Sequence, residues 1–137
     1  MLTLAIIKPD AVAGNKAGKV LAHLEAAGFK VRAARMVRLT TSQAEAFYAV
    51  HKERPFFRPL VSFMTSGPAI PMALEHPDAV KKLREVIGAT DPREAAAGTV
   101  RKLFAESKER NAIHASDSEE NARREVGFFF TEGELGT

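Results

Sequence analysis

Residues 111–118 contain the side chain best suited to chemistry, because His114 ends a short apolar run and stands directly before a helix-start signal. Ser116-x-x-Glu119 has the spacing of a capping box, with Asp117 and Ser118 as alternative caps. The first turn of a helix carries unpaired N–H groups and the positive end of the dipole, which favour an anion in front of it. The segment therefore suits a phosphoryl group on or near His114, although by itself a histidine in a polar turn is the more common explanation.

Composition predicts one globular domain over residues 1–137. The chain has 45% hydrophobic residues, which excludes disorder as the default, and it is too short for two ordinary domains. It contains no cysteine, so neither a disulfide framework nor a thiolate site is available. Lysine and arginine number 20 against 17 aspartates and glutamates, a surplus that suits an anionic ligand but also an ordinary solvated surface.

The N-terminal apolar run 2–7 is too short for a secretory signal, and no run approaches the length that spans a membrane. The sequence thus predicts a cytoplasmic enzyme or binding domain with no membrane partner.

Three elements are predicted in the first part of the chain. Leu2–Ile7 is apolar on both faces, as in a central strand, and delivers Lys8 at its end. A helical pattern runs from Lys16 to Gly28. Residues 29–39 alternate as in a half-buried strand, and one face is expected to carry Phe29, Val31, Ala33, Val37 and Leu39.

The remaining elements complete an alternating order. Helices are predicted after Thr40-Thr41-Ser42, from Pro55 to Met64, and from Pro77 to Ile87. Between them, Ala69–Leu74 is a strand whose Pro71 belongs near its start or on an unpaired side. Residues 89–111 form a long loop with about one helical turn before the histidine segment. The order fits an α+β fold, a ferredoxin-like βαββαβ antiparallel sheet sandwich with an inserted helical hairpin.

Short motifs occur in a specific order along the whole chain: Lys8-Pro9-Asp10, Arg54-Pro55-Phe56-Phe57, Ser66-Gly67-Pro68, Gly88-Ala89-Thr90, Gly98-Thr99-Val100-Arg101 and the histidine segment. Together they resemble the nucleoside diphosphate kinase family, whose signature reads Asn-x-x-His-Gly-Ser-Asp-Ser. The resemblance implies a ping-pong relay. His114 would take the γ-phosphoryl from a nucleoside triphosphate, typically ATP, and pass it to a nucleoside diphosphate with broad base specificity.

The resemblance also implies roles for the residues around the phosphates. Glu125 would hold the second nitrogen of His114, although from the residues alone an exposed helical glutamate paired with Arg124 is the more common explanation. The cations Lys8, Arg84 and Arg101 and the hydroxyl of Thr90 would bind the phosphates. For each of these residues an ordinary surface role is the alternative.

For the nucleoside, the resemblance implies that Phe56 stacks on the base and that Leu60, one helical turn later, lines the same slot. The alternative is a core stripe, in which Phe56 and Phe57 pack beside Leu60 and Val61. We expect Phe57 in the core and Phe56 exposed. Asn111 would bind the ribose 3′-hydroxyl. The residues implied beside the imidazole are Tyr48, Ser116 and Asp117.

The implied cofactor is Mg²⁺, bound with the nucleotide phosphates rather than by a dedicated protein site. A homo-oligomer is expected. The chain ends at Thr137 without the longer C-terminal segment of many relatives, so dimer, tetramer and hexamer all stay open. The sequence departs from the family at Ala11 and Ala115, where glycine is usual, and at Lys102-Leu103. Ala115 would be strained only if the backbone there needs a positive φ.

Two other functions are alternatives to the kinase. A non-catalytic nucleotide or RNA-binding module predicts aromatic residues exposed on the strands, which carry only Phe29, and no specific nucleic acid is expected. A phosphohistidine carrier between proteins would need His114 but would not need Phe56, Arg84, Thr90 and Arg101 together.

Overall fold

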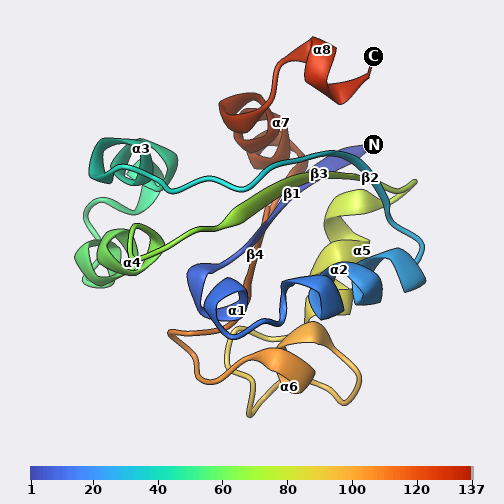
Figure 1. Ribbon diagram of the computed structural model, residues 1–137, viewed down its shortest axis with the longest axis horizontal. Coiled ribbons are helices and arrows are strands. Elements are labelled where there is room, and N and C mark those ends of the chain that lie inside the picture. Colours follow the sequence, from blue (N-terminus) through green and yellow to red (C-terminus); the bar gives the residue numbers. More distant parts are fainter. Residues whose placement is uncertain (137) are drawn as a thin grey trace.

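A computed structural model describes residues 1–136 and contains one antiparallel sheet, which lies between helices (Figure 1). Within these residues its strands are β1 (Leu2–Ile7), β2 (Lys30–Ala34), β3 (Ile70–Glu75) and β4 (Ile113–Ala115), in the order β2-β3-β1-β4. That order is the ferredoxin-like topology predicted from the sequence. Pro71 is the second residue of β3, so it lies near the strand start as expected.

The helices follow the predicted order, with α3 and α4 forming the inserted hairpin. Their bounds are α1 Pro9–Ala13, α2 Ala17–Ala26, α3 Thr41–Phe47, the 3₁₀ helix η1 Ala49–His51, α4 Phe57–Met64, α5 Ala79–Ile87, α6 Val100–Phe104, α7 Glu119–Phe129 and α8 Glu132–Leu135. The short helices α1 and α8 were not predicted. The segment 89–111 contains only α6 as regular structure, as the sequence indicated.

Two cores lie on opposite faces of the sheet. Leu4 and Ile6 of β1 pack with α3, α4 and α7, whereas Ala5 and Ile7 pack with α2, α5 and α6. This follows from the alternation of side chains along a strand, since β1 is apolar on both faces. Figure 1 shows the α3–α4 hairpin on one side of the sheet and α2 and α5 on the other.

The prediction that residues 29–39 form one strand with a single apolar face is wrong. The register of β2 against β3 shifts between Val31 and Ala33, which is the signature of a β-bulge. Phe29 and Val31 therefore join the core of α2 and α5, whereas Ala33, Val37 and Leu39 join the core of α3 and α4. An extra residue in a strand moves every following side chain to the opposite face of the sheet.

Three helix starts differ in detail from the prediction. Thr40 caps α3 in a capping box with Gln43, and α4 begins at Phe57, two residues after Pro55. Of the three caps that the sequence offered for α7, the structure uses the alternative Ser118, whose side chain accepts from the Asn121 N–H at 3.1 Å, and not the capping box of Ser116. Ser116 still lies in extended chain beside β1, where its hydroxyl has other partners.

Among residues 1–136, no helix combines the length and apolar character needed to cross a membrane.

Candidate active site

His114 is the middle residue of β4, where strand alternation turns its side chain away from its neighbours Ile113 and Ala115. These two pack toward α5, whereas His114 lies opposite Ile6 and faces the other core. Phe47 and Tyr48 contact the imidazole edge-on, with ring centroids 5.4 and 6.0 Å away. The side chain retains 17% exposure, so the ring is held on its sides but still open to a ligand.

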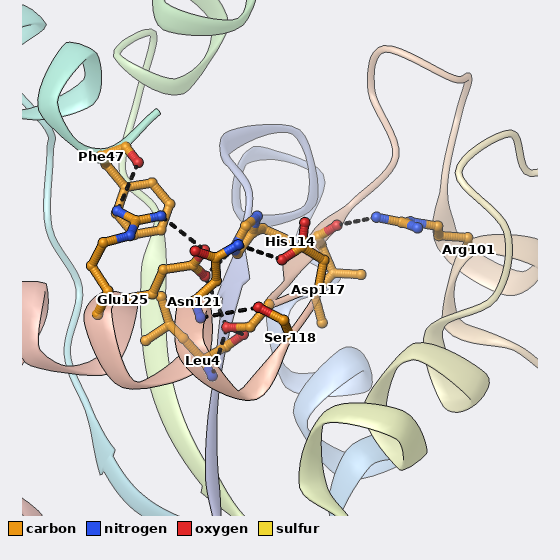
Figure 2. Close-up of polar contacts among 11 residues, drawn as sticks. Leu4, Phe47, Arg101, His114, Asp117, Ser118, Asn121 and Glu125 are labelled. Atoms are coloured by element: carbon orange, nitrogen blue, oxygen red, sulfur yellow. Dashed lines mark hydrogen bonds and ion pairs between the residues drawn. The ribbon is translucent and has the colours of Figure 1, made fainter. Parts of the chain in front are cut away.

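Glu125 fixes the orientation of that ring. It lies on the buried stripe of α7 with Ala122 and Phe129 and is 5% exposed, so the alternative of a surface glutamate is wrong. Its Oε1 lies 2.7 Å from His114 Nε2 (Figure 2). A carboxylate accepts, so Nε2 carries the proton and Nδ1 keeps its lone pair.

Burial lowers the pKa of His114, and the hydrogen bond that Nε2 donates to Glu125 opposes this shift only in part. The imidazole is therefore neutral near pH 7. A neutral ring with Nε2 bound and Nδ1 free is the form required of a histidine nucleophile.

Ser116 and Arg124 complete the surroundings of the carboxylate. The Ser116 hydroxyl donates to Glu125 Oε1 at 2.8 Å, and an Arg124 guanidinium nitrogen lies 3.5 Å from Oε2. Asp117 is exposed on the helix side, where it accepts from the Asn121 amide at 2.6 Å. The hydrogen bond from Asn121 lowers the pKa of Asp117, and the charges of the nearby Arg84 and His114 lower it further. The Asp117 carboxylate therefore stays ionised.

Lys8 lies at the end of β1, directly before α1, and is 8% exposed. Its Nζ donates to Asn111 Oδ1 at 2.9 Å, and the Asn111 amide in turn donates to the Thr90 carbonyl at 3.2 Å. Burial, and then Arg101, lower the pKa of Lys8 to about 8, while Asp10 opposes the shift. A buried ammonium with one neutral partner has capacity left for an anion.

Arg101 is the second residue of α6, and its guanidinium is turned toward the histidine strand. It donates to the Ile113 carbonyl at 2.7 Å and to the Gly88 carbonyl at 3.1 Å. Burial, and then Arg84, lower the pKa of Arg101 to about 10, which indicates two guanidinium groups in mutual repulsion. Their repulsion is relieved when an anion binds between them.

A pocket of about 470 Å³ lies between α5 and α6, with Arg84, Thr90 and Arg101 on its wall. Thr90 is exposed and follows Gly88, the residue that ends α5. The structure therefore places Arg84 beside Thr90 and Arg101, which the sequence placed on two separate motifs, whereas Lys8 is not part of the pocket wall.

Gly88 ends α5 with φ +87°, and a Cβ there would lie 2.6 Å from Thr99 Oγ1. We expect Gly88→Ala to lower the free energy of unfolding by about 3 kcal/mol, because the strain of a positive φ adds to a clash. Gly98→Ala is the matched control, since Gly98 has φ +83° but nothing within 4 Å, and it should cost about 1 kcal/mol. Urea unfolding of both variants measures the difference, and equal costs would contradict the clash.

Phe56 and Leu60 lie apart from this cluster, at the start of α4. Phe56 is 44% exposed and contacts the His51 ring and the Arg54 guanidinium, whereas Phe57 is 5% exposed in the core. The predicted split between an exposed Phe56 and a buried Phe57 is confirmed. Leu60 is half-buried and packs against the core of α3 and α4.

The Tyr48 hydroxyl is buried beside His114 and has no hydrogen-bond partner within residues 1–136. Burial, and then Glu125, raise the pKa of Tyr48, so the phenol keeps its proton and remains a donor. An unpaired buried donor at this place is costly unless a ligand completes it.

The positive φ in the histidine segment occurs at Ala112 and not at Ala115. Ala115 is extended, pairs with Ala5 and is unstrained, and Ala11 lies in the short helix α1. Ala112 has φ +74°, a conformation that costs an alanine about 1–3 kcal/mol. The two alanines at the family's glycine positions therefore leave the backbone intact. Lys102 and Leu103 are exposed on α6.

Sequence reasoning missed two residues that shape the site, Phe47 and Asp10, whereas it considered Arg124 only as a surface partner of Glu125. Phe47 gave no signal, because an aromatic residue on a helix usually has an ordinary packing role. Asp10 belongs to the Lys8-Pro9-Asp10 motif, but the motif alone assigns it no role. Its contact with Ala112, 102 positions away, has no trace in local spacing. Within the described part of the chain, no group of three histidine, aspartate or glutamate side chains could hold a metal ion.

Comparison with known proteins gives one consistent result. The family model described as nucleoside diphosphate kinase matches residues 2–135. Similar proteins include the nucleoside diphosphate kinases of Halorhodospira halophila (62% identical, covering 97% of this chain and 94% of the relative) and Campylobacter curvus (56% identical, 97% and 97%).

Solved structures with the same fold include the nucleoside diphosphate kinase of Aquifex aeolicus. It is 47% identical with a TM-score of 0.95, over 97% of this chain and 96% of that one. The Halobacterium salinarum enzyme, solved in complex with CDP, is 38% identical with a TM-score of 0.93, over 98% and 90%.

Proposed function

Because this chain belongs to the nucleoside diphosphate kinase family, we propose that His114 Nδ1 is the atom that carries the phosphoryl group between nucleotides. The enzyme transfers the γ-phosphoryl of a nucleoside triphosphate to a nucleoside diphosphate by a ping-pong route. The observation that carries the assignment to Nδ1 is the 2.7 Å contact between His114 Nε2 and Glu125 Oε1. It leaves only the other ring nitrogen with a lone pair.

In the first half-reaction, the Nδ1 lone pair attacks the γ-phosphorus as the bond from phosphorus to the bridging β-phosphate oxygen breaks. The nucleoside diphosphate leaves with that electron pair. The imidazole gains positive charge, which the Glu125 carboxylate at Nε2 offsets. The second half-reaction reverses these events with a different diphosphate, whose terminal oxygen attacks the phosphohistidine.

Phosphoryl transfer depends mostly on position and charge, and the cations around the pocket supply both. We assign Lys8, Arg84 and Arg101 to the phosphate oxygens, with the Thr90 hydroxyl as a further donor. Tyr48 would donate its unpaired hydroxyl beside the ring. Asn111 would bind the ribose 3′-hydroxyl, and Ser116 and Asp117 would support the histidine strand and the helix that follows it.

Phe56 is proposed as the base platform, with Leu60 lining the same slot. Its exposed ring on α4 and the cations on α5 and α6 belong to opposite faces of the sheet, so a nucleotide that reached both would lie across the end of the sheet near His114. The CDP complex of the Halobacterium salinarum relative supports nucleotide binding by this fold. Stacking on a π-face predicts weak base selectivity.

Mg²⁺ is proposed to enter with the nucleotide. The pocket wall carries the guanidinium groups of Arg84 and Arg101 and a single carboxylate, Glu85, which does not make a carboxylate cage. This donor set fits phosphates already bound to the ion. When bound, Mg²⁺ neutralises phosphate charge. The chain's own cations provide the remaining positive charge and set the orientation.

The test is a labelling and chase experiment. Incubation with γ-labelled ATP should give an acid-labile label on the protein, and addition of ADP, GDP, CDP or UDP should remove it at similar rates. A label that only a second protein removes would identify a phosphohistidine carrier. A label that leaves much faster with one base than with the others would refute the stacking platform.

The pKa values predict a bell-shaped pH profile. The kcat/KM should fall below the lowered pKa of His114, where Nδ1 gains a proton, and again above about pH 8, where Lys8 loses its charge. Lys8→Arg is the matched control, because a guanidinium stays charged, and its alkaline limb should move toward the value of about 10 for Arg101. An unchanged alkaline limb in this variant would assign the limb to another group.

Three further properties are proposed from family membership. The chain acts in the cytoplasm, where its nucleotide substrates are found. It forms a homo-oligomer, with dimer, tetramer and hexamer all compatible. One domain, residues 1–137, carries the whole activity, a proposal supported by the match of the family model to residues 2–135.

A further inference from the structure

The turn before β4 is strained at a fully buried alanine. Ala112 has φ +74°, and the Ile113 N–H donates across it to the Asn111 carbonyl at 2.9 Å. This is a classic γ-turn, which L-residues rarely adopt. Such a conformation persists only where its surroundings hold it, so the contacts of the Ala112 peptide groups require an explanation.

The carbonyl and the N–H of Ala112 both form hydrogen bonds with the segment Lys8-Pro9-Asp10, one with each neighbour of Pro9. The Lys8 N–H donates to the Ala112 carbonyl at 2.8 Å, and the Ala112 N–H donates to Asp10 Oδ2 at 3.0 Å. The first contact is between backbone groups and depends little on residue type. The second depends on the carboxylate of Asp10.

Asp10 is 7% exposed, and its Oδ1 has no hydrogen-bond partner within residues 1–136. A buried carboxylate is costly unless positive charge lies near it. Lys8 and Arg110 supply that charge: burial and Arg101 lower the pKa of Lys8 against the opposing effect of Asp10, and Glu106 raises the pKa of Arg110 with a smaller contribution from Asp10. The positive charge of Arg101, on α6, lowers the pKa of Lys8. Asp10 is thus a buried charge that the proposed mechanism leaves unused.

We propose that Asp10 is a positioning residue for phosphoryl transfer, whose carboxylate holds the Ala112 peptide in the strained turn that aligns Asn111 and His114. The turn connects them directly, because Asn111 precedes it and contacts Lys8, whereas His114 follows it in β4. This inference rests on the proposed function of His114. The competing role of Asp10 is purely structural, as an acidic residue in the first turn of α1.

Substitutions at both ends of the contact separate these roles. Asp10→Ala should lower kcat by about 10- to 100-fold, because small displacements of reacting groups have effects of that size. Asp10→Asn keeps an acceptor for the Ala112 N–H and should retain most of the rate at pH 7. Its alkaline limb should move to lower pH, since the charge that opposes deprotonation of Lys8 is gone.

The decisive variant is Asp10→Ala combined with Ala112→Gly. Glycine adopts a positive φ without a Cβ penalty, so the double variant should be faster than Asp10→Ala alone. A helix-start role of Asp10 would be indifferent to residue 112. A double variant no faster than the single one, or a kcat of Asp10→Ala equal to wild type, would overturn the proposal.

A readout without catalysis separates this inference from the proposed function. Hydrogen exchange of the Ala112 amide, followed by NMR, should be at least about ten times faster in Asp10→Ala than in wild type and unchanged in Asp10→Asn. That result in a protein that forms no phosphohistidine would refute the proposed function and support the contact. Normal labelling of His114 with equal Ala112 exchange in all three proteins would refute the contact and leave the function intact.

Discussion

His114→Ala should abolish phosphoryl transfer, with a loss of kcat on the order of 10⁴-fold or more, because the covalent intermediate can no longer form. The fold should survive, since the side chain is 17% exposed and its ring contacts are at one edge of the core of α3 and α7. The measurements are coupled-assay turnover and acid-labile labelling by γ-labelled ATP. Both should fall to background in the variant.

The matched control is His23→Ala, which removes a partly buried histidine from α2, where it contacts Phe104. Wild-type labelling is expected in this variant. If label persisted on His114→Ala and disappeared from His23→Ala, the phosphoryl carrier would have been assigned to the wrong histidine. Binding of a nucleoside diphosphate by His114→Ala, measured by calorimetry, would show that the pocket is still formed.

Lys8→Met should lower the rate of phosphohistidine formation by about 10²- to 10³-fold, the usual cost of removing one group that stabilises transition-state charge. Methionine keeps much of the volume of the buried stem but cannot donate to Asn111 Oδ1 or to phosphate. Single-turnover labelling over a range of ATP concentrations would separate weaker binding from slower chemistry. A charge that acts in the transition state should reduce the rate even at saturating ATP.

Lys8→Arg again provides the comparison, since it restores the charge with a different shape. It should be much faster than Lys8→Met at pH 7. Equal losses in the two variants would indicate that the hydrogen bond from Lys8 Nζ to Asn111, rather than the positive charge, sets the rate.

Local patterns predicted most of the fold. The strand Leu2–Ile7 was predicted with its observed bounds, because a strand that is apolar on both faces leaves little choice of environment. The helices from Ala17 and from Ala79 follow from their apolar periodicity. The sequence could not predict the bulge in β2, because an extra residue is recognised only against the partner strand β3. It could not choose among Ser116, Asp117 and Ser118 as the cap of α7, because all three are good caps.

Some features of the candidate site could likewise be predicted from the sequence, and others only from the tertiary structure. Residue type and spacing determined the family, the histidine that could carry a phosphoryl group, and the list of cations, because these chemical requirements are tied to short motifs. The tertiary structure alone decided which nitrogen of His114 is free, since that depends on Glu125 reaching it from the buried stripe of α7. It also decided that the strain lies at Ala112 and that Asp10 holds it, because a contact across 102 positions depends on how β1 and β4 pair.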